Sequence, residues 1–100
     1  MKSLTEDQKR HLRRLGHALK PVVLMGAAGL TDAVMAEIDQ ALDDHELIKV
    51  KLVADDRSQR QELGERISRE QKAALVQAVG NVVLLFRRSR IERKRRIALP

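Results

Sequence analysis

Apolar residues in the first part of the chain recur at helical spacing. Leu12, Leu15 and Leu19 fall within one arc of a helix at about 100° per residue, so the pattern predicts a helix over residues 5–18 whose leucines face a core. Thr5 is the expected N-cap. The opposite side of this helix and the residues after it are basic: Lys9, Arg10, Arg13, Arg14, His17 and Lys20.

The next apolar run, residues 22–25, is bounded by Pro21 and Gly26 and predicts a strand that is buried on both faces. A second helix is expected from Leu30 or Thr31, with Thr31 as its cap. Its inward positions are Val34, Ile38, Ala41 and Leu42. The outward positions are acidic and are expected to face solvent: Glu37, Asp39, Asp43 and Asp44.

The second half of the chain contains an alternating strand, a helix and a hairpin. Residues 46–53 alternate in polarity, which predicts a half-buried strand with Lys49 and Lys51 on its open side. Residues 55–70 predict a third helix that Asp55 or Asp56 caps. Two further strands, residues 75–79 and 82–87, flank Gly80-Asn81, which suits a type II′ turn.

The predicted element order is αβαβαββ, which indicates an α/β fold: a two-layer sandwich with helices packed on a four-stranded mixed sheet. One hundred residues suffice for one domain, so residues 1–100 are expected to form a single unit. Residues 88–100 form a basic C-terminal segment that is expected to be mostly irregular.

Composition narrows the chemistry. The chain has no cysteine, and its three histidines lack the spacing of metal ligands, so no metal site is expected and the histidines are predicted to lie at the surface or its boundary. The longest apolar run is far shorter than the roughly 20 residues of a membrane span, and the N-terminus lacks a signal-peptide pattern. We therefore expect a soluble, cytoplasmic protein without a membrane partner.

Charge is segregated along the chain. The net charge of +6 equals that of the last fourteen residues, because the first 86 are neutral in total. Such segregation favours oriented binding of a polyanion, although a basic run can also be a solvated tail. Phe86 is the only aromatic residue and is expected in the core, so base stacking on an aromatic sheet is not expected.

The segment Gly26-Ala27-Ala28-Gly29 joins the first strand to the second helix. Glycines allow a tight turn and a close approach to a ligand, and the first amides of a helix attract phosphate, so the pattern predicts a phosphate-binding loop; a purely structural turn is the alternative. The glycine pattern fits neither a dinucleotide fold nor a P-loop, and no catalytic cluster is identifiable. The chain is therefore expected to be neither an enzyme nor a cofactor-binding protein.

Several short motifs together resemble the CRM domain family, especially its small stand-alone YhbY-like bacterial members. The similarity extends over residues 3–99. Its motifs are Leu19-Lys20-Pro21, Gly26-x-x-Gly29-Leu30-Thr31, Glu37-Ile38, Ala41-Leu42, the run 45–51 and the run 80–87. The resemblance implies a fold similar to the C-terminal domain of translation initiation factor 3, and RNA binding through the GxxG loop. It also implies association with the precursor of the large ribosomal subunit and with its assembly.

The sequence differs from the family pattern at two places. Ala27 and Ala28 stand where many family loops carry a polar or basic residue, so the loop offers only backbone groups. No glycine occurs between the third helix and the hairpin, which leaves the end of that helix uncertain.

Two functions remain open from the sequence. The first is a monomeric RNA-binding module that acts on ribosomal RNA, with ribosomal proteins as further candidate partners. Its expected RNA-binding residues are Gly26, Ala27, Ala28, Gly29, Lys20, Lys9, Arg10, Arg13, Arg14, Arg87 and Arg88. The second is an adaptor whose acidic second helix docks on a basic ribosomal protein or assembly factor.

Overall fold

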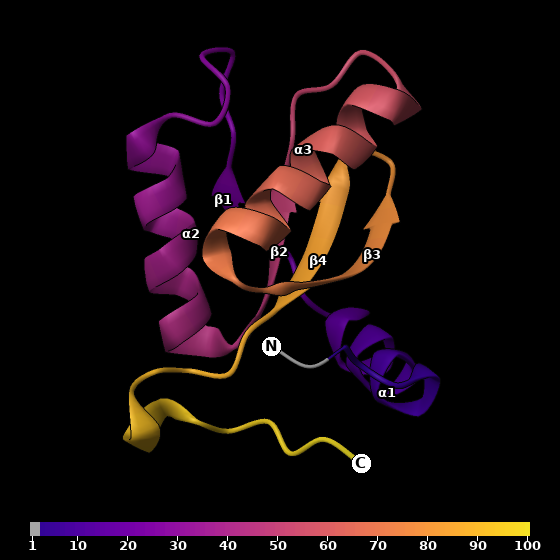
Figure 1. Ribbon diagram of the computed structural model, residues 1–100, viewed down its shortest axis with the longest axis vertical. Helices are drawn as coiled ribbons and strands as arrows, with labels where there is room; N and C mark the ends of the chain where they lie inside the picture. Colours follow the sequence, from indigo (N-terminus) through magenta and orange to yellow (C-terminus); the bar gives the residue numbers. More distant parts are fainter. Residues whose placement is uncertain (1–2) are drawn as a thin grey trace.

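A computed structural model describes residues 3–100 and shows three helices around a four-stranded sheet (Figure 1). The elements follow the predicted αβαβαββ order. They are α1 (Glu6–Gly16), β1 (Pro21–Leu24), α2 (Asp32–His45), β2 (Leu47–Lys51), α3 (Arg57–Gln71), β3 (Ala74–Val79), β4 (Val82–Phe86) and a short 3-10 helix, η1 (Glu92–Lys94). The α/β fold class is thus confirmed.

The sheet is mixed, with strand order β1-β2-β4-β3. β1 runs parallel to β2, while β4 is antiparallel to both of its neighbours. The parallel pair requires a crossover connection, and the GxxG loop and α2 supply it. Gly80 opens the β3–β4 turn with a φ of 57°, which agrees with the predicted glycine-led hairpin.

Local capping explains where the helices begin. Thr5 and Gln8 form a reciprocal capping box at α1, with the Gln8 amide donating to Thr5 Oγ1 over 3.1 Å. Thr31 and Asp56 cap α2 and α3, as the sequence predicts. α3 ends without glycine because Lys72 itself adopts the left-handed conformation, at a φ of 52°.

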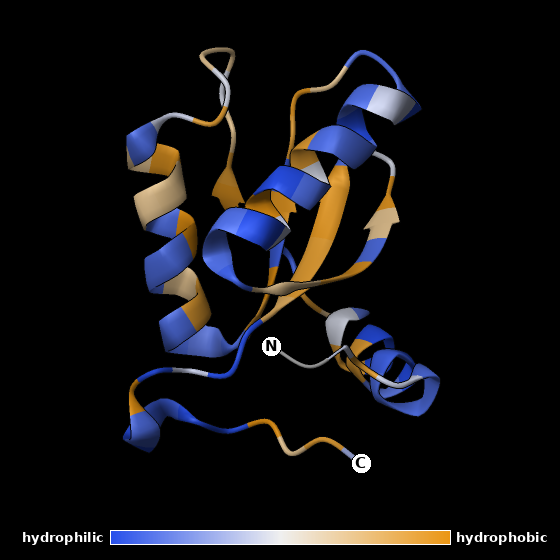
Figure 2. Cartoon of the chain, in the orientation of Figure 1, coloured by the Kyte–Doolittle hydropathy of each residue, from blue (hydrophilic) through white to orange (hydrophobic). Residues whose placement is uncertain are grey.

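The main core lies between the sheet and the pair α2 and α3. Both helices and the strands β1, β2 and β4 contribute buried residues, and Figure 2 shows the hydrophobic colour of the strands under the hydrophilic outer side of α3. The fully buried members include Ile38, Leu42, Ile48, Val50, Ile67, Val83 and Leu85. This face accounts for most of the buried apolar surface and therefore for most of the hydrophobic stabilisation.

A second, smaller core lies on the other face of the sheet, beneath α1 and the C-terminal segment. It contains Leu12, Leu47, Val76, Leu84 and Phe86, and Ile97 and Leu99 pack against it. Both faces of the sheet are therefore packed against other parts of the chain. α2 and α3 form the helical layer that a two-layer sandwich requires, and α1 with the C-terminal segment covers part of the opposite face. The prediction that Phe86 belongs to the core is confirmed.

The prediction that all three leucines of the first helix face the core is wrong for two of them. Leu12 is fully buried, whereas Leu15 and Leu19 are exposed. α1 ends at Gly16, two residues earlier than the predicted boundary, so Leu19 lies outside the helix. The short helix rests on the sheet near Leu12 and Gly16, and this leaves part of the sheet uncovered. The prediction that the first strand is buried on both faces is therefore wrong, because Val22 and Leu24 are exposed and only Val23 of β1 is buried.

Gly16 sets how closely α1 approaches the sheet. A Cβ at this position would lie 2.7 Å from Leu84 Cδ2, and Leu84 is itself buried. Gly16→Ala is therefore expected to destabilise the protein by about 1–2 kcal/mol, because the cost of overpacking exceeds the gain in helix propensity. Gly26→Ala is the matched control, since a Cβ there meets nothing within 4 Å. Urea unfolding of both variants measures the difference, and equal stabilities would contradict this account of the packing.

Candidate nucleic-acid interface

The GxxG loop forms a tight turn directly after β1. The Gly29 amide donates to the Gly26 carbonyl over 3.0 Å, and the Thr31 amide donates to the Gly29 carbonyl over 3.0 Å. Gly29 has a φ of 83°, a conformation that side-chain-bearing residues rarely adopt, whereas Gly26 has no such constraint. The second glycine is therefore required by the backbone.

The middle of the loop is open to solvent. Ala27 and Ala28 are exposed, and within residues 3–100 their amides donate to no protein acceptor. Thr31 Oγ1 accepts a hydrogen bond from the Val34 amide. The amides that precede Val34 in the first turn of α2 have no intrahelical acceptor, and they lie beside the loop. The loop thus presents backbone donors at the positive end of a helix, which suits an anion.

The basic residues of α1 are accessible and weakly held. Lys9 and Arg10 form exposed ion pairs with Glu6 and Asp7, at 3.8 and 3.1 Å. Exposed pairs of this kind contribute little to stability, so these cations remain available to a ligand. Arg13 and Arg14 form no ion pair with the part of the chain that the structure describes.

The loop and α1 lie at different ends of the molecule. The molecule is 35 Å long, and Figure 1 shows the loop at one end of this long axis and α1 toward the other. Lys20 precedes β1 at the α1 end, while Gly26 follows β1 at the loop end. The predicted RNA-binding residues therefore form two separate groups, and β1 connects them.

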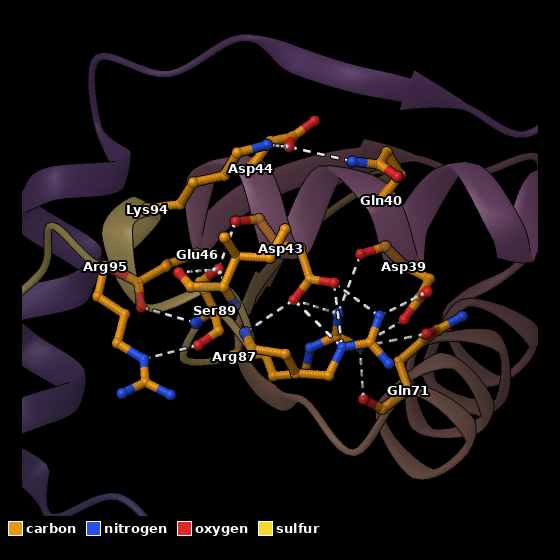
Figure 3. A network of polar contacts seen from close by, with 12 residues as sticks. Asp39, Gln40, Asp43, Asp44, Glu46, Gln71, Arg87, Ser89, Lys94 and Arg95 are labelled. Carbon is orange, nitrogen blue, oxygen red and sulfur yellow. Dashed lines mark hydrogen bonds and ion pairs between the residues drawn. The ribbon is translucent and has the colours of Figure 1, made fainter.

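Arg87 lies away from both groups. It is 8 % exposed, and its guanidinium donates to Asp39 Oδ1 and to the Asp39 carbonyl, each over 2.9 Å. It also donates to the Gln71 carbonyl and lies 3.3 Å from Asp43 (Figure 3). Arg87 thus joins α2, α3 and β4 inside the protein, while its neighbour Arg88 is exposed.

The acidic face of α2 is covered by the C-terminal segment, so the prediction that it faces solvent is wrong for most of its residues. Arg90 donates to both oxygens of Asp43, and Lys94 Nζ lies 2.6 Å from Asp44 (Figure 3). Asp43 is only 7 % exposed. Helical periodicity places these carboxylates outside the main core correctly, but it carries no information about which segment returns to cover them.

Glu46 anchors the same segment through backbone contacts. Its side chain is fully buried and accepts the amides of Ser89, Arg96 and Ile97, at 2.8, 2.8 and 3.0 Å. Glu46 adopts a φ of 66° at the end of α2, and this unusual conformation directs its carboxylate toward residues 89–97. We refer to Asp39, Asp43, Asp44 and Glu46 together with their partners in residues 87–97 as the carboxylate clamp.

The carboxylate clamp does not follow from helical periodicity or from any local motif of the chain. The charge distribution does contain a sign of it. Residues 21–48 carry six acidic and no basic side chains, and residues 87–100 carry seven basic ones, so the two segments are complementary in charge. The prediction that this segregation only creates a field for an external polyanion is therefore incomplete. Part of the positive charge is instead neutralised inside the molecule.

The clamp changes the acidity of its carboxyl groups. The hydrogen bond from the Arg90 side chain lowers the pKa of Asp43 to about 2, although burial opposes the shift. Burial alone would raise the pKa of Glu46, but the three backbone amides outweigh it and lower that pKa. The Lys94 ammonium lowers the pKa of Asp44. All three groups are therefore charged at neutral pH.

Acid is expected to release the C-terminal segment. Because folding lowers these pKa values, their contribution to stability is complete above the ordinary values near 4 and is lost as the pH falls toward 2. For Asp43, the fall in pKa from 3.8 to about 2 corresponds to about 2 kcal/mol. Urea unfolding between pH 7 and 2, with amide exchange at Ser89 and Arg96, measures both effects.

Asp43→Asn should remove the contribution of Asp43 to this pH dependence, about 2 kcal/mol, and leave those of Asp44 and Glu46. Glu37→Gln, an exposed carboxylate on the same helix, should retain it. A pH profile of Asp43→Asn that equals that of the unchanged protein would contradict the assignment.

The three histidines lie where the sequence predicts them, at the surface or its boundary. His17 and His45 are exposed and His11 is half-buried, as expected of surface and boundary positions. Within residues 3–100, none of the helices combines the length and the apolar character that crossing a membrane requires.

Similar proteins place the chain in a family. The model of the CRS1 / YhbY (CRM) domain matches residues 4–87. The chain is 48% identical over 89 residues to an "RNA-binding protein" of Haemophilus influenzae, with 89% of this chain and 90% of that protein covered. It is 41% identical over 87 residues to a "Probable RNA-binding protein" of Pseudomonas aeruginosa, with 87% and 84% covered.

A solved structure supports the same relationship. The solution structure of a hypothetical protein from Staphylococcus aureus matches with a TM-score of 0.82 and 34% sequence identity, and the match covers 98% of this chain and 100% of that one. Sequence and fold therefore agree over nearly the whole length. The chain belongs to the CRS1/YhbY (CRM) domain family, as the resemblance of its motifs indicates.

Proposed function

We propose that this protein binds RNA and acts on ribosomal RNA during assembly of the large ribosomal subunit. The observation that carries the proposal is the exposed GxxG turn, whose two alanine amides face solvent beside the N-terminus of α2. Family membership and relatives named as RNA-binding proteins support RNA as the anion. The ribosomal target follows from the resemblance to YhbY-like proteins.

The loop and the basic residues have different roles in this proposal. Gly26, Ala27, Ala28 and Gly29 hold a phosphate through the backbone, and Lys20 lies at the other end of β1. The α1 residues Lys9, Arg10, Arg13 and Arg14, together with exposed Arg88, supply long-range attraction. Arg87 is not part of the proposed surface, because its guanidinium is held by Asp39, Asp43 and Gln71.

The proposed role is binding by a monomer in the cytoplasm, without catalysis. Several phosphate contacts distributed over two groups of residues make the affinity dependent on salt, because each contact releases counterions from the RNA. The shape of a folded RNA, more than its sequence, would then select the site, since backbone amides and lysine or arginine side chains at phosphates do not distinguish bases.

The adaptor hypothesis loses the surface on which it depended. Asp39, Asp43 and Asp44 are paired with Arg87, Arg90 and Lys94 of the same chain. An external basic protein would have to displace these five ion pairs within residues 3–100 to reach the carboxylates. We therefore do not propose α2 as a protein-docking helix.

A charge placed in the loop tests the phosphate contact. Ala27→Asp is expected to weaken RNA binding by about tenfold, because a carboxylate would face the phosphate that the amides hold. Ala27→Asn is the matched control, since it adds a side chain of the same size without charge, and it should change the affinity by less than about threefold. Fluorescence anisotropy with a ribosomal RNA fragment measures both. Equal affinities for the two variants would show that the loop is a structural turn only.

Crosslinking tests the cellular target. Ultraviolet crosslinking in cells, followed by sequencing of the bound RNA, is expected to recover precursor ribosomal RNA of the large subunit, and Ala27→Asp should reduce the recovery relative to Ala27→Asn. Recovery of other RNA classes alone would reject the ribosomal role. Co-sedimentation with a protein after RNase treatment, without RNA crosslinks, would support the adaptor instead.

A further inference from the structure

Half of one sheet face is bare. On the α1 side, the strand registers align the side chains in rows that run across the sheet. α1 and the C-terminal segment cover the row of Leu47, Phe86 and Ala74, together with Val76 and Leu84. The two rows nearer the GxxG loop are as follows: Leu24, Lys51, Val82 and Val79 in the first, then Pro21, Lys49, Leu84 and Gln77 in the second. We call these two rows, without the covered Leu84, the open sheet face.

The open sheet face combines apolar exposure with a hollow. Leu24 is 65% exposed and Val79 is 64% exposed, which is unusual for large apolar residues within strands. The second row and its surroundings line an open hollow of about 460 Å³ whose rim includes His17 and Lys20. Four strands at about 4.8 Å spacing give the face a width of about 14 Å, enough for a short run of nucleotides.

Its charge is entirely positive. Lys49 and Lys51 are the only charged residues in the two rows, and they lie on the central strand β2. Lys51 is exposed and Lys49 is half-buried. Lys20 and His17 add donors at the α1 end of the face. A surface with lysines at its centre, apolar side chains on both sides and no carboxylate in either row suits a polyanion with apolar parts.

The face is continuous with the GxxG loop. The Met25 amide, immediately before the loop, donates to the Lys51 carbonyl over 2.8 Å. Leu24 pairs with Lys51 and is two residues from Gly26. A chain held by the loop amides can therefore continue across β1 and β2 toward Lys20 and α1. The open sheet face thus connects the GxxG loop with the basic residues of α1, which Figure 1 shows far apart.

We propose that single-stranded RNA crosses the open sheet face, with its phosphates at Lys49 and Lys51 and its sugars and bases against Leu24 and Val79. This inference rests on the proposed RNA-binding function and extends it to a second subsite. A second copy of this chain is a poorer occupant, because a two-fold interface would bring the lysines of both copies together. Nucleotides instead supply both the anions and the flat apolar surfaces that the face matches.

The test compares three variants in RNA binding. Lys49→Gln with Lys51→Gln removes the two central charges, and Leu24→Ser removes the most exposed apolar contact. The matched control, Arg69→Gln with Lys72→Gln, removes two exposed charges associated with α3, on the other side of the sheet. Circular dichroism and thermal melting verify that each variant is folded. The probe is an oligouridylate of about twelve nucleotides, within the usual site size of such proteins.

The lysine variant is expected to bind the probe about tenfold more weakly and to lower the salt slope by about one to one and a half. Leu24→Ser should weaken binding about threefold with an unchanged salt slope, because it removes no charge. The control pair should change affinity by less than about twofold. Crosslinked peptides identified by mass spectrometry should come from β1 and β2.

Two outcomes would overturn the inference. One is unchanged binding in both sheet variants while Ala27→Asp still weakens it, which would leave the proposed function intact and confine the RNA to the loop and α1. The other is polyglutamate competing as well as the RNA does, which would identify the face as a site for acidic protein. Failure of the unchanged protein to bind any RNA would instead reject the proposed function itself.

Discussion

The buried carboxylate of Glu46 determines how the last part of the chain is placed. It accepts three backbone amides from residues 89–97, and a carboxylate that accepts several such bonds holds its partners firmly because each bond is charge-assisted. The positive φ of Glu46 directs the chain from α2 into β2, and the Arg87 amide donates to its carbonyl. One residue therefore links α2, β2, the end of β4 and the C-terminal segment.

The position of the C-terminal segment decides which surfaces are available. Arg90 and Lys94 pair with Asp43 and Asp44 on the outer face of α2, and this reduces the negative field by which the helix would repel RNA. Ile97 and Leu99 continue onto the smaller core and pack against it. The bare half of the sheet is what remains after α1 and this segment have covered the rest. The path of the C-terminal segment therefore determines both the pairing of the α2 carboxylates and the exposure of the uncovered half of the sheet.

Much of the fold could be predicted from local pattern, and the reasons are physical. Thr5, Thr31 and Asp56 act as caps because the cap and its helix are adjacent in sequence. Gly80 likewise marks a turn that two neighbouring strands close. Leu15 and Leu19 behave differently, because their burial depends on the length of α1 and on how closely Gly16 lets it approach Leu84. The spacing of apolar residues along a helix does not predict how closely that helix approaches a strand that is remote in sequence.

The candidate site divides in the same way. The Gly26–Gly29 turn and the basic side of α1 are local features, and the structure places them where a local argument expects them. Arg87 is different, since only the return of β4 beside α2 brings it to Asp39 across 48 positions of the chain. The alternating polarity of residues 46–53 predicts that Lys49 and Lys51 lie on an open strand face. Their relation to the loop depended on the parallel pairing of β1 with β2, which the sequence does not specify.

The lack of exposed aromatic residues limits the kind of recognition that the proposed surface can achieve. Phe86 is buried, so bases would meet Leu24 and Val79, which offer apolar area without the directional stacking of a ring. Lysines and backbone amides contact phosphates equally well beside any base. Specificity must then come from geometry, namely an RNA whose backbone can reach the loop, the open sheet face and α1 together. A folded RNA with an exposed single strand meets that requirement better than a regular duplex, because the loop and α1 lie at different ends of a 35 Å molecule.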